Sequence, residues 1–217
     1  MTAITITKDL RGQFGPARDQ LTRPTCIAFA VSDVHAAAIG PWEPLSVEYL
    51  YYHAVQKSGN KPSDGVSVRH IRDALLADGQ SNETHWPYLP ILPADLKLWA
   101  PPPNPSPLHK RKHKLIPGTF KNAMDLVNAD TPAVMIMSIS DAFFQPMSDH
   151  SIDSTEPVDP TRMHAVVVVG AGTRSGTDFL FVRSSWGEDW GLEGCAWVSE
   201  RYTAPRIRSL IQLLEAA

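Results

Sequence analysis

The stretch Val182–Val198, VRSSWGEDWGLEGCAWV, places three Trp and three Gly within seventeen residues, between two apolar runs that read as strands. Glycine allows tight backbone turns, and each indole ring covers a large apolar area. The stretch therefore predicts a compact connection between two strands of a β-rich region.

The sequence around this connection supports a largely β second half. The segments TPAVMIMSIS, MHAVVVVGAG and DFLFVRSSW are rich in Val, Ile, Met and Phe and are broken by Gly and Pro, which predicts strands. A short helix is expected over TFKNAMDLVNA (residues 119–129). The polar residues 145–162, which include three prolines, predict a long surface loop.

The first half predicts helices. Residues 25–39 are Ala-rich, with Thr25 as a candidate cap and Gly40-Pro41 as the stop. LSVEYLYYHAVQ (45–56) and SVRHIRDALLADG (67–79) show apolar residues at helical spacing. The prolines between residues 92 and 107 predict an extended connection between two lobes.

We assign no catalytic or binding role to two further segments, one basic and one amphipathic. HKRKHK (109–114) lacks interleaved aromatic residues and fits a solvated loop or strand edge. The amphipathic C-terminal stretch RIRSLIQLLEAA (206–217) is expected to pack on the body of the protein or on a partner.

Composition narrows the class of protein. The 217 residues are 43% hydrophobic and 20% charged with a net charge of −3, which argues against a nucleic-acid-binding surface. No membrane span or signal peptide is visible, so we expect a cytoplasmic monomer without membrane partners; secretion by a signal-independent route stays open. His35, His53 and His70 have no metal-like spacing, and we expect neither a metal nor a cofactor.

Three residues suggest nucleophilic chemistry. Cys26 is expected in the first turn of a helix, where unpaired amide groups lower a thiol pKa. Gln20 precedes it in a turn and is placed to donate to an oxyanion. His164 opens an apolar strand after a polar loop, whereas no strand follows the rival His150. Cys195 reads as core packing.

Four strings in order resemble the papain-like (C1) cysteine peptidases. They are DQLTRPTCIAFA (19–30), LSVEYLYY (45–52), MHAVVVVGAG (163–172) and FVRSSWGEDWGLEGCAWV (181–198). They correspond to the family's Gln six residues before the nucleophilic Cys, its LS helix, its His-Ala-Val strand and its N-S-W-G element. The run 64–88, ending in Trp-Pro-Tyr, is similar to that of bacterial members. Four such matches in order are hard to obtain by chance.

The resemblance implies an α+β, papain-like fold of two lobes. A helical N-terminal lobe would span about residues 16–100 and a β-barrel-like C-terminal lobe about residues 108–217, with the active site in the cleft between them. The implied activity is that of a cysteine endopeptidase acting on peptide or protein substrates.

The resemblance also assigns roles to individual residues. Cys26 would be the nucleophile and His164 the general base and later acid. Gln20 and the Cys26 backbone amide would form the oxyanion hole. Gly65, Ala165 and Trp186 would line the substrate groove, and Trp186 would also cover the third catalytic position.

Two features depart from the family pattern. Ser184 occupies the position of the family's Asn, and a Ser hydroxyl is shorter, so we expect it to reach the imidazole through a water and to weaken catalysis. Asp189 and Asp149 are alternative orienting groups. In addition, only 25 residues precede Cys26, whereas family members usually carry a long inhibitory extension. Either an extension has been trimmed or activity is restrained differently.

Two other functions stay open at this point. The same fold could serve a deamidase or acyltransferase, because fold does not settle the reaction. Ser184 could instead mark a catalytically weakened, peptide-binding protein.

Overall fold

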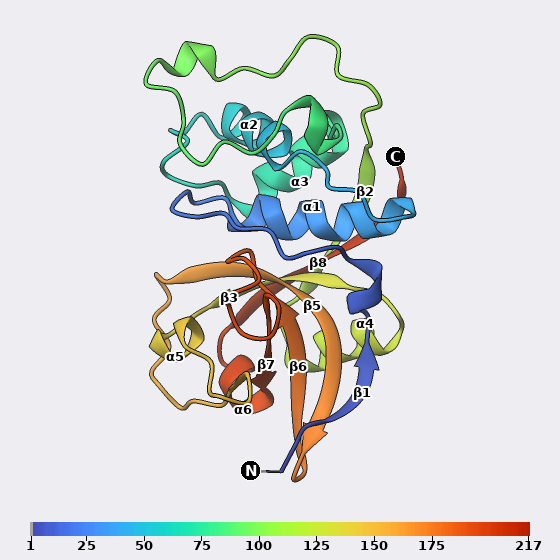
Figure 1. The fold of residues 1–217 in the computed structure, drawn as a ribbon, viewed down its shortest axis with the longest axis vertical. Helices are drawn as coiled ribbons and strands as arrows, with labels where there is room; N and C mark the ends of the chain where they lie inside the picture. The colour runs from blue at the N-terminus through green and yellow to red at the C-terminus, as the bar shows by residue number, and fades with distance from the viewer. Residues whose placement is uncertain (1) are drawn as a thin grey trace. The chain divides into compact units, whose positions relative to one another are not determined.

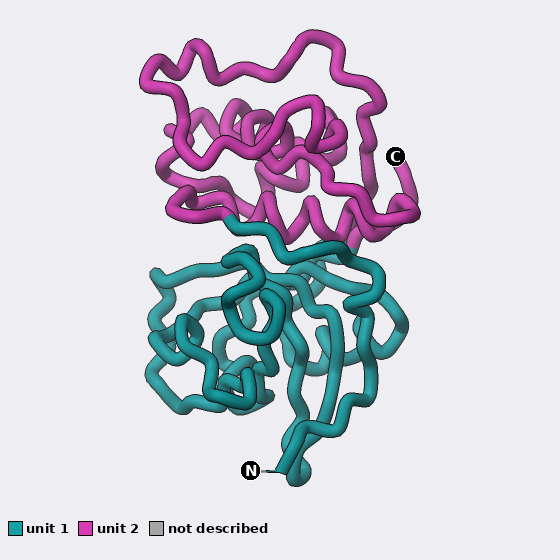
Figure 2. Tube along the Cα trace, in the orientation of Figure 1, with its two compact units in different colours: residues 1–19, 114–212 teal, residues 20–113, 213–217 magenta. Residues whose placement is uncertain are grey.

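The computed structural model describes residues 2–217, which form two compact units (Figure 2). Unit 1 comprises Met1–Asp19 and Lys114–Gln212, and unit 2 comprises Gln20–His113 and Leu213–Ala217. The sequence predicts lobes that are each one continuous segment, whereas each unit here combines two segments of the chain.

Unit 2 contains the three long helices that the sequence predicts (Figure 1). They are α1 (Cys26–Ile39), α2 (Val47–Ser58) and α3 (Val68–Ala77), followed by the 3-10 turns η2 (Glu83–His85) and η3 (Leu96–Leu98). The predicted cap of α2 is confirmed, because Ser46 Oγ accepts from Tyr49 N at 3.0 Å. Thr25 precedes α1, but its side chain makes no capping hydrogen bond.

Unit 1 is built on a sheet of eight strands with short helices beside it (Figure 1). The strands are β1 (Thr5–Asp9), β2 (Arg111–Pro117), β3 (Ala133–Ser138), β4 (Ser151–Ile152), β5 (Met163–Arg174), β6 (Thr177–Arg183), β7 (Cys195–Ser199) and β8 (Ile207–Ala216). The helices are α4 (Phe120–Asn128), α5 (Asp141–Phe144), α6 (Glu200–Thr203) and the 3-10 turn η1 (Arg11–Gln13). β2 and β8 also have residues in unit 2.

The α+β fold class is confirmed, but the sheet is not a closed barrel. Its strand order is β2-β8-β3-β5-β6-β7-β4, and within residues 2–217 the end strands β2 and β4 do not pair. β4 is two residues long and pairs in parallel with β7, which leaves too little strand to close a ring. The twelve-residue β5 pairs on one edge first with β3 and then with β1.

Two segments differ from the sequence prediction. The N-terminal strand β1 has mostly exposed side chains and pairs with β5 through backbone groups, so it lacks the hydrophobic pattern that would reveal it. The amphipathic C-terminal stretch forms β8, whose residues Ile207–Ile211 pair with β3. The basic run enters β2, where half-buried and exposed residues alternate as at a strand edge.

The packing of the helices in unit 2 includes a buried polar centre at His35. Its Nδ1 lies 2.8 Å from Gln80 Oε1, while Gln80 Nε2 donates to Ser32 Oγ and to the Ser46 carbonyl. Because the Gln80 oxygen accepts, His35 Nδ1 must carry the proton. The pKa of His35 is lowered to about 4, chiefly by burial; the hydrogen bond to Gln80 opposes this shift, and the charges of Arg111 and His109 add to it.

This depressed pKa predicts a loss of stability in mild acid. Between pH 6.5 and about 4, the unfolded chain binds a proton at His35 and the folded chain does not. The contribution of this group to the free energy of unfolding is therefore fully present above pH 6.5 and decreases as the pH is lowered to about 4. The contribution amounts to about 3 kcal/mol. Urea unfolding of His35→Asn from pH 7 to 4 should show a flatter pH dependence than wild type. The exposed His85→Asn serves as control, and equal slopes in all three proteins would contradict the prediction.

Candidate functional site

Cys26 is the first residue of α1 and is partly exposed. The helix behind it is buried from Ile27 to Ala36, so the sulfur is carried at the tip of a core element. The first amides of a helix lack intrahelical partners and favour negative charge at that end. The predicted position in the first helical turn is confirmed.

The turn from Gln20 to Thr25 is held by side-chain hydrogen bonds. Gln20 Nε2 donates to the Arg23 carbonyl at 2.8 Å, and the Gln20 carbonyl accepts from Tyr88 Oη at 2.7 Å. The Thr25 hydroxyl lies 3.0 Å from Tyr88 Oη and is the donor there, because Tyr88 donates to Gln20. These contacts fix the side-chain amide of Gln20 within the turn that leads into Cys26.

A buried ion pair, which the sequence reading missed, anchors the same turn. Arg23 and Glu48 form a bidentate pair, with Nη1 to Oε2 at 2.6 Å and Nη2 to Oε1 at 2.9 Å, and Glu48 is fully buried. The Glu48 carboxylate also accepts from Leu89 N at 3.0 Å and from Trp99 Nε1 at 2.6 Å. A Glu among the apolar residues of α2 was the available signal, but its partner lies 25 residues away.

In unit 1, His164 is the second residue of β5 and is buried. Its Nε2 lies 3.0 Å from Ser184 Oγ, and the ring of Trp186 stacks on it with centroids 4.6 Å apart. The expectation that Ser184 would need a water to reach the imidazole is wrong. Ser184 follows β6, which pairs with β5, and this brings its short side chain within direct reach.

Burial lowers the pKa of His164 to about 3, so the isolated imidazole is neutral near pH 7. Either nitrogen of a neutral ring can be the donor, and a hydroxyl can both donate and accept. An amide carbonyl at that place would only accept. Ser184 therefore fixes the orientation of the ring without by itself selecting a tautomer.

The Trp-rich connection covers this histidine with aromatic rings. Trp186 stacks on Phe144 at 5.0 Å and meets Trp190 edge to face at 5.7 Å, and Trp190 Nε1 donates to the Phe143 carbonyl. The glycines permit the turn beneath the rings. Gly191 has a φ of +64°, and a Cβ there would collide with the Cys195 carbonyl. The compact connection predicted from this stretch is confirmed.

The remaining predicted residues divide between the two units. Ala165 follows His164 and is buried, opposite Ile136 of β3. In unit 2, Gly65 has a φ of +74° and lies against Pro24, since a Cβ built there would be 3.6 Å from the Pro24 Cβ. Unit 1 thus groups His164, Ser184, Ala165 and Trp186, and unit 2 groups Gln20, Cys26 and Gly65.

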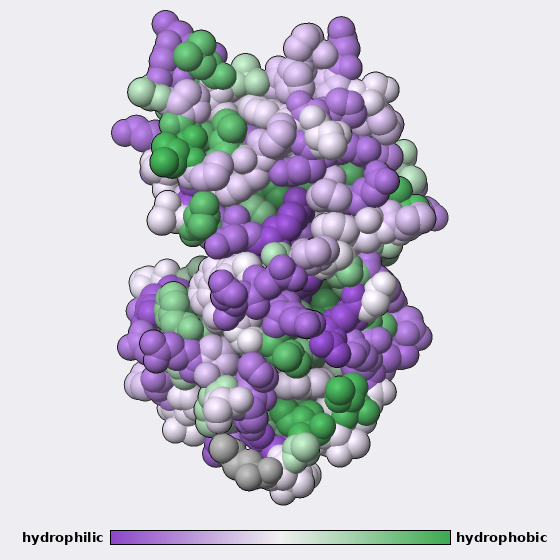
Figure 3. All heavy atoms as spheres, viewed as in Figure 1, coloured by the Kyte–Doolittle hydropathy of each residue, from purple (hydrophilic) through white to green (hydrophobic). Residues whose placement is uncertain are grey.

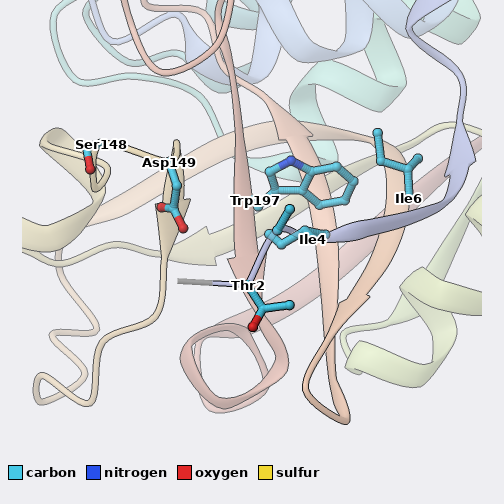
Figure 4. Close-up of a pocket in the computed structure, with 7 residues that line it drawn as sticks. Thr2, Ile4, Ile6, Ser148, Asp149 and Trp197 are labelled. Atoms are coloured by element: carbon cyan, nitrogen blue, oxygen red, sulfur yellow. The ribbon is translucent and has the colours of Figure 1, made fainter.

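The alternative orienting residue Asp149 is engaged elsewhere. Its carboxylate accepts from Arg174 at 2.6 Å and from Ser151 Oγ at 2.7 Å. It borders a hollow of about 360 Å³ that Trp197 also lines (Figure 4). That hollow contains none of the predicted site residues. The Asp149 carboxylate is already paired with the Arg174 guanidinium.

Other side chains were also candidates for chemistry. Cys195 is buried in β7, and burial raises its thiol pKa to about 11, which suits core packing rather than attack. Among residues 2–217, no three His, Cys, Asp or Glu side chains gather where they could hold a metal ion. None of the described helices is both long and apolar enough to cross a bilayer.

Comparison with known proteins points to one family. The profile of papain family cysteine proteases matches residues 106–209. A thiol protease of Hemerocallis sp. is 34% identical over 199 residues, which cover 89% of this chain and 53% of that protein. The chain spans about a quarter to a half of the length of the first curated relatives that it matches.

Solved structures share the fold. Xylellain, a cysteine protease from Xylella fastidiosa, superposes with a TM-score of 0.75 at 21% identity, over 97% of this chain and 86% of that one. A structure solved to explain antibody cross-reactivity between the mite allergens Blo t 1 and Der p 1 gives 0.79 at 20% identity, over 99% and 71%.

The buried ion pair in unit 2 yields a stability prediction. Glu48→Leu leaves the Arg23 guanidinium buried without its counter-ion, and we expect it to lower the free energy of unfolding by about 3–5 kcal/mol. Arg23→Met/Glu48→Leu removes both charges and should be more stable than Glu48→Leu alone. Urea titrations of the full cycle measure this coupling.

The exposed pair of Lys121 and Asp125 provides the control, since Asp125→Ala should cost less than about 1 kcal/mol. Additive losses in the Arg23 and Glu48 cycle would contradict the prediction.

Proposed function

We propose that this chain is a papain-family cysteine endopeptidase that hydrolyses peptide bonds through a Cys-His pair. The observation that carries the proposal is the burial of His164 and its hydrogen bond to Ser184. Of eight histidines, this one is buried under Trp186 with its Nε2 held by Ser184, so that the orientation of its ring is fixed.

The proposed reaction begins at Cys26. Its thiolate attacks the carbonyl carbon of the substrate, and the oxyanion is stabilised by Gln20 Nε2 and the Cys26 amide. His164 then donates a proton to the departing amine, which leaves a thioester on Cys26. Water, deprotonated by His164, attacks the thioester and releases the new carboxyl end with the thiol restored.

The low pKa of His164 bears on how this pair works. Burial alone disfavours the imidazolium, whereas a nearby anion favours it. We propose that the charged pair depends on the Cys26 thiolate as counter-ion. The positive charge on His164 then accompanies the negative charge on sulfur and is lost when the thiolate is removed.

Replacing the nucleophile is the first test. Cys26→Ala should abolish cleavage of a denatured protein substrate, because no covalent intermediate can form. Cys195→Ala, which removes a buried thiol of raised pKa, is the matched control and should retain activity. Cleavage by Cys26→Ala at the wild-type rate would overturn the proposal. Mass spectrometry of the products distinguishes cleavage from deamidation, which adds about one mass unit to an intact chain.

Thiol reactivity tests the pairing of Cys26 with His164. At pH 6 an ordinary thiol with a pKa near 8.5 is almost wholly protonated, so fast alkylation of Cys26 by iodoacetamide would report a stabilised thiolate. His164→Ala should slow that alkylation about tenfold or more, because the imidazolium is lost. Slow alkylation in both proteins would instead favour the peptide-binding alternative that Ser184 suggests.

Ser184 should influence turnover more than binding. Ser184→Ala removes the hydrogen bond to His164 Nε2, and we expect kcat to fall about fivefold with KM nearly unchanged, since one such bond is worth about 1 kcal/mol. Ser138→Ala is the control, because that hydroxyl is also buried in unit 1 and has no hydrogen-bond partner among the described residues. An unchanged kcat in Ser184→Ala would show that the hydroxyl does not orient the base.

A further inference from the structure

The surface of unit 2 carries an apolar hollow of about 510 Å³ next to the turn that precedes Cys26. Three segments far apart in sequence form it. They are residues 22–24, residues 61–63, and residues 90–96 after the Trp-Pro-Tyr motif. Its volume lies in the range of pockets that bind small ligands or side chains. We call this feature the apolar hollow.

The lining of the apolar hollow is unusually hydrophobic for an exposed surface. Its apolar members are Pro24, Pro62, Pro90, Ile91, Leu92 and Leu96. Ile91 is 84% exposed and Leu96 is 47% exposed. Hydrophobic residues gather on the part of unit 2 that carries η3 (Figure 3). Contiguous apolar side chains that face solvent mark binding surfaces.

The hollow is continuous with the residues that the proposed function uses. Pro24 lines it and lies two residues before Cys26. Gly65, the predicted groove glycine, packs against the same Pro24. An extended peptide advances about 3.3 Å per residue, so a chain bound at Cys26 reaches this surface within a few residues.

The charged residues that line the hollow narrow the class of ligand that it can bind. Arg23 lines the hollow, but its guanidinium is neutralised by Glu48. Lys61 also lines it and is exposed, and the lining contains neither Asp nor Glu. Beside the lining, the Asp64 carboxylate accepts from Lys61 N at 3.3 Å and from Ser63 Oγ at 3.0 Å. Within the lining itself, the charged side chain that remains open to a ligand is that of Lys61.

We propose that the apolar hollow binds an apolar side chain of the substrate that has an acidic residue beside it. The apolar side chain packs on Ile91, Leu92 and Leu96, while the carboxylate lies near the Lys61 ammonium. This inference rests on the proposed function for its link to Cys26. The binding itself requires no catalysis.

The test compares two substitutions in the hollow with two matched substitutions outside it. Ile91→Asp and Lys61→Glu change the lining, whereas Leu98→Asp and Lys114→Glu make the same chemical changes at exposed residues that do not line it. Cleavage of a randomised synthetic octapeptide library is profiled for each protein. We expect wild type to enrich Leu or Ile next to Asp or Glu at one fixed distance from the cut bond.

Ile91→Asp should lower the preference for the apolar residue at that position at least fivefold, and Lys61→Glu should reverse the preference for its acidic neighbour. Both controls should keep the wild-type profile. If Ile91→Asp and Lys61→Glu retain cleavage with an unchanged profile, the proposed role of the apolar hollow is wrong and the proposed function stays intact.

A binding measurement separates the two proposals. Acetylated tetrapeptide amides that pair Leu with Glu, Leu with Lys, or Gln with Glu are titrated into ¹⁵N-labelled Cys26→Ala protein. Shifts at residues 61–63 and 90–96 that are strongest for Leu with Glu, and are lost in Ile91→Asp, support the hollow even if the wild-type protein cleaves nothing. Equal shifts for all three peptides, or none, contradict it.

Discussion

The arrangement of unit 2 depends on one buried carboxylate. Glu48 is fully enclosed, and its two oxygens accept from both terminal nitrogens of Arg23, from Leu89 N and from Trp99 Nε1. A buried charge is tolerated only when its lone pairs are occupied in this way. Breaking any one of these contacts would leave a buried polar group without a partner. Glu48 therefore holds three separate parts of the chain to α2, at Arg23, Leu89 and Trp99. One of them is the turn that carries Gln20 and leads into Cys26.

Unit 1 fixes the position of His164 by other means. His164 has no buried counter-ion among the described residues of its own unit, and its position follows from the pairing of β5 with β6 and from the stack of Trp186. An apolar cover strengthens the hydrogen bond to Ser184 by excluding water, but it also lowers the pKa of His164. Burial alone therefore leaves this imidazole uncharged near pH 7, and an imidazolium at this position would require a neighbouring anion.

Periodicity and composition were enough to predict the three long helices, the strands β3, β5, β6 and β7, and the first-turn position of Cys26. These features rest on local patterns of apolar residues. The Arg23 and Glu48 pair could not be predicted, because its partners lie 25 residues apart and each alone reads as a surface charge. β1 was missed because its side chains are mostly exposed. The direct contact of Ser184 with His164 depends on strand register, which the sequence does not specify; the catalytic roles of these residues stay predictions.

The Glu48 carboxylate, which holds the turn before Cys26, also shapes the apolar hollow. The segment that carries Ile91, Leu92 and Leu96 is tied at both ends, at Leu89 and at Trp99, to the pair of Glu48 and Arg23. Because Pro90 and Pro93 restrict the backbone between these ties, exposed apolar side chains are held apart from the core instead of collapsing onto it. A surface ordered before binding loses less conformational entropy when a ligand arrives. The turn before Cys26 and the apolar hollow thus both depend on a single charged group, so a change at Glu48 should disturb both together, whereas a change at Ile91 or Lys61 should affect the hollow alone.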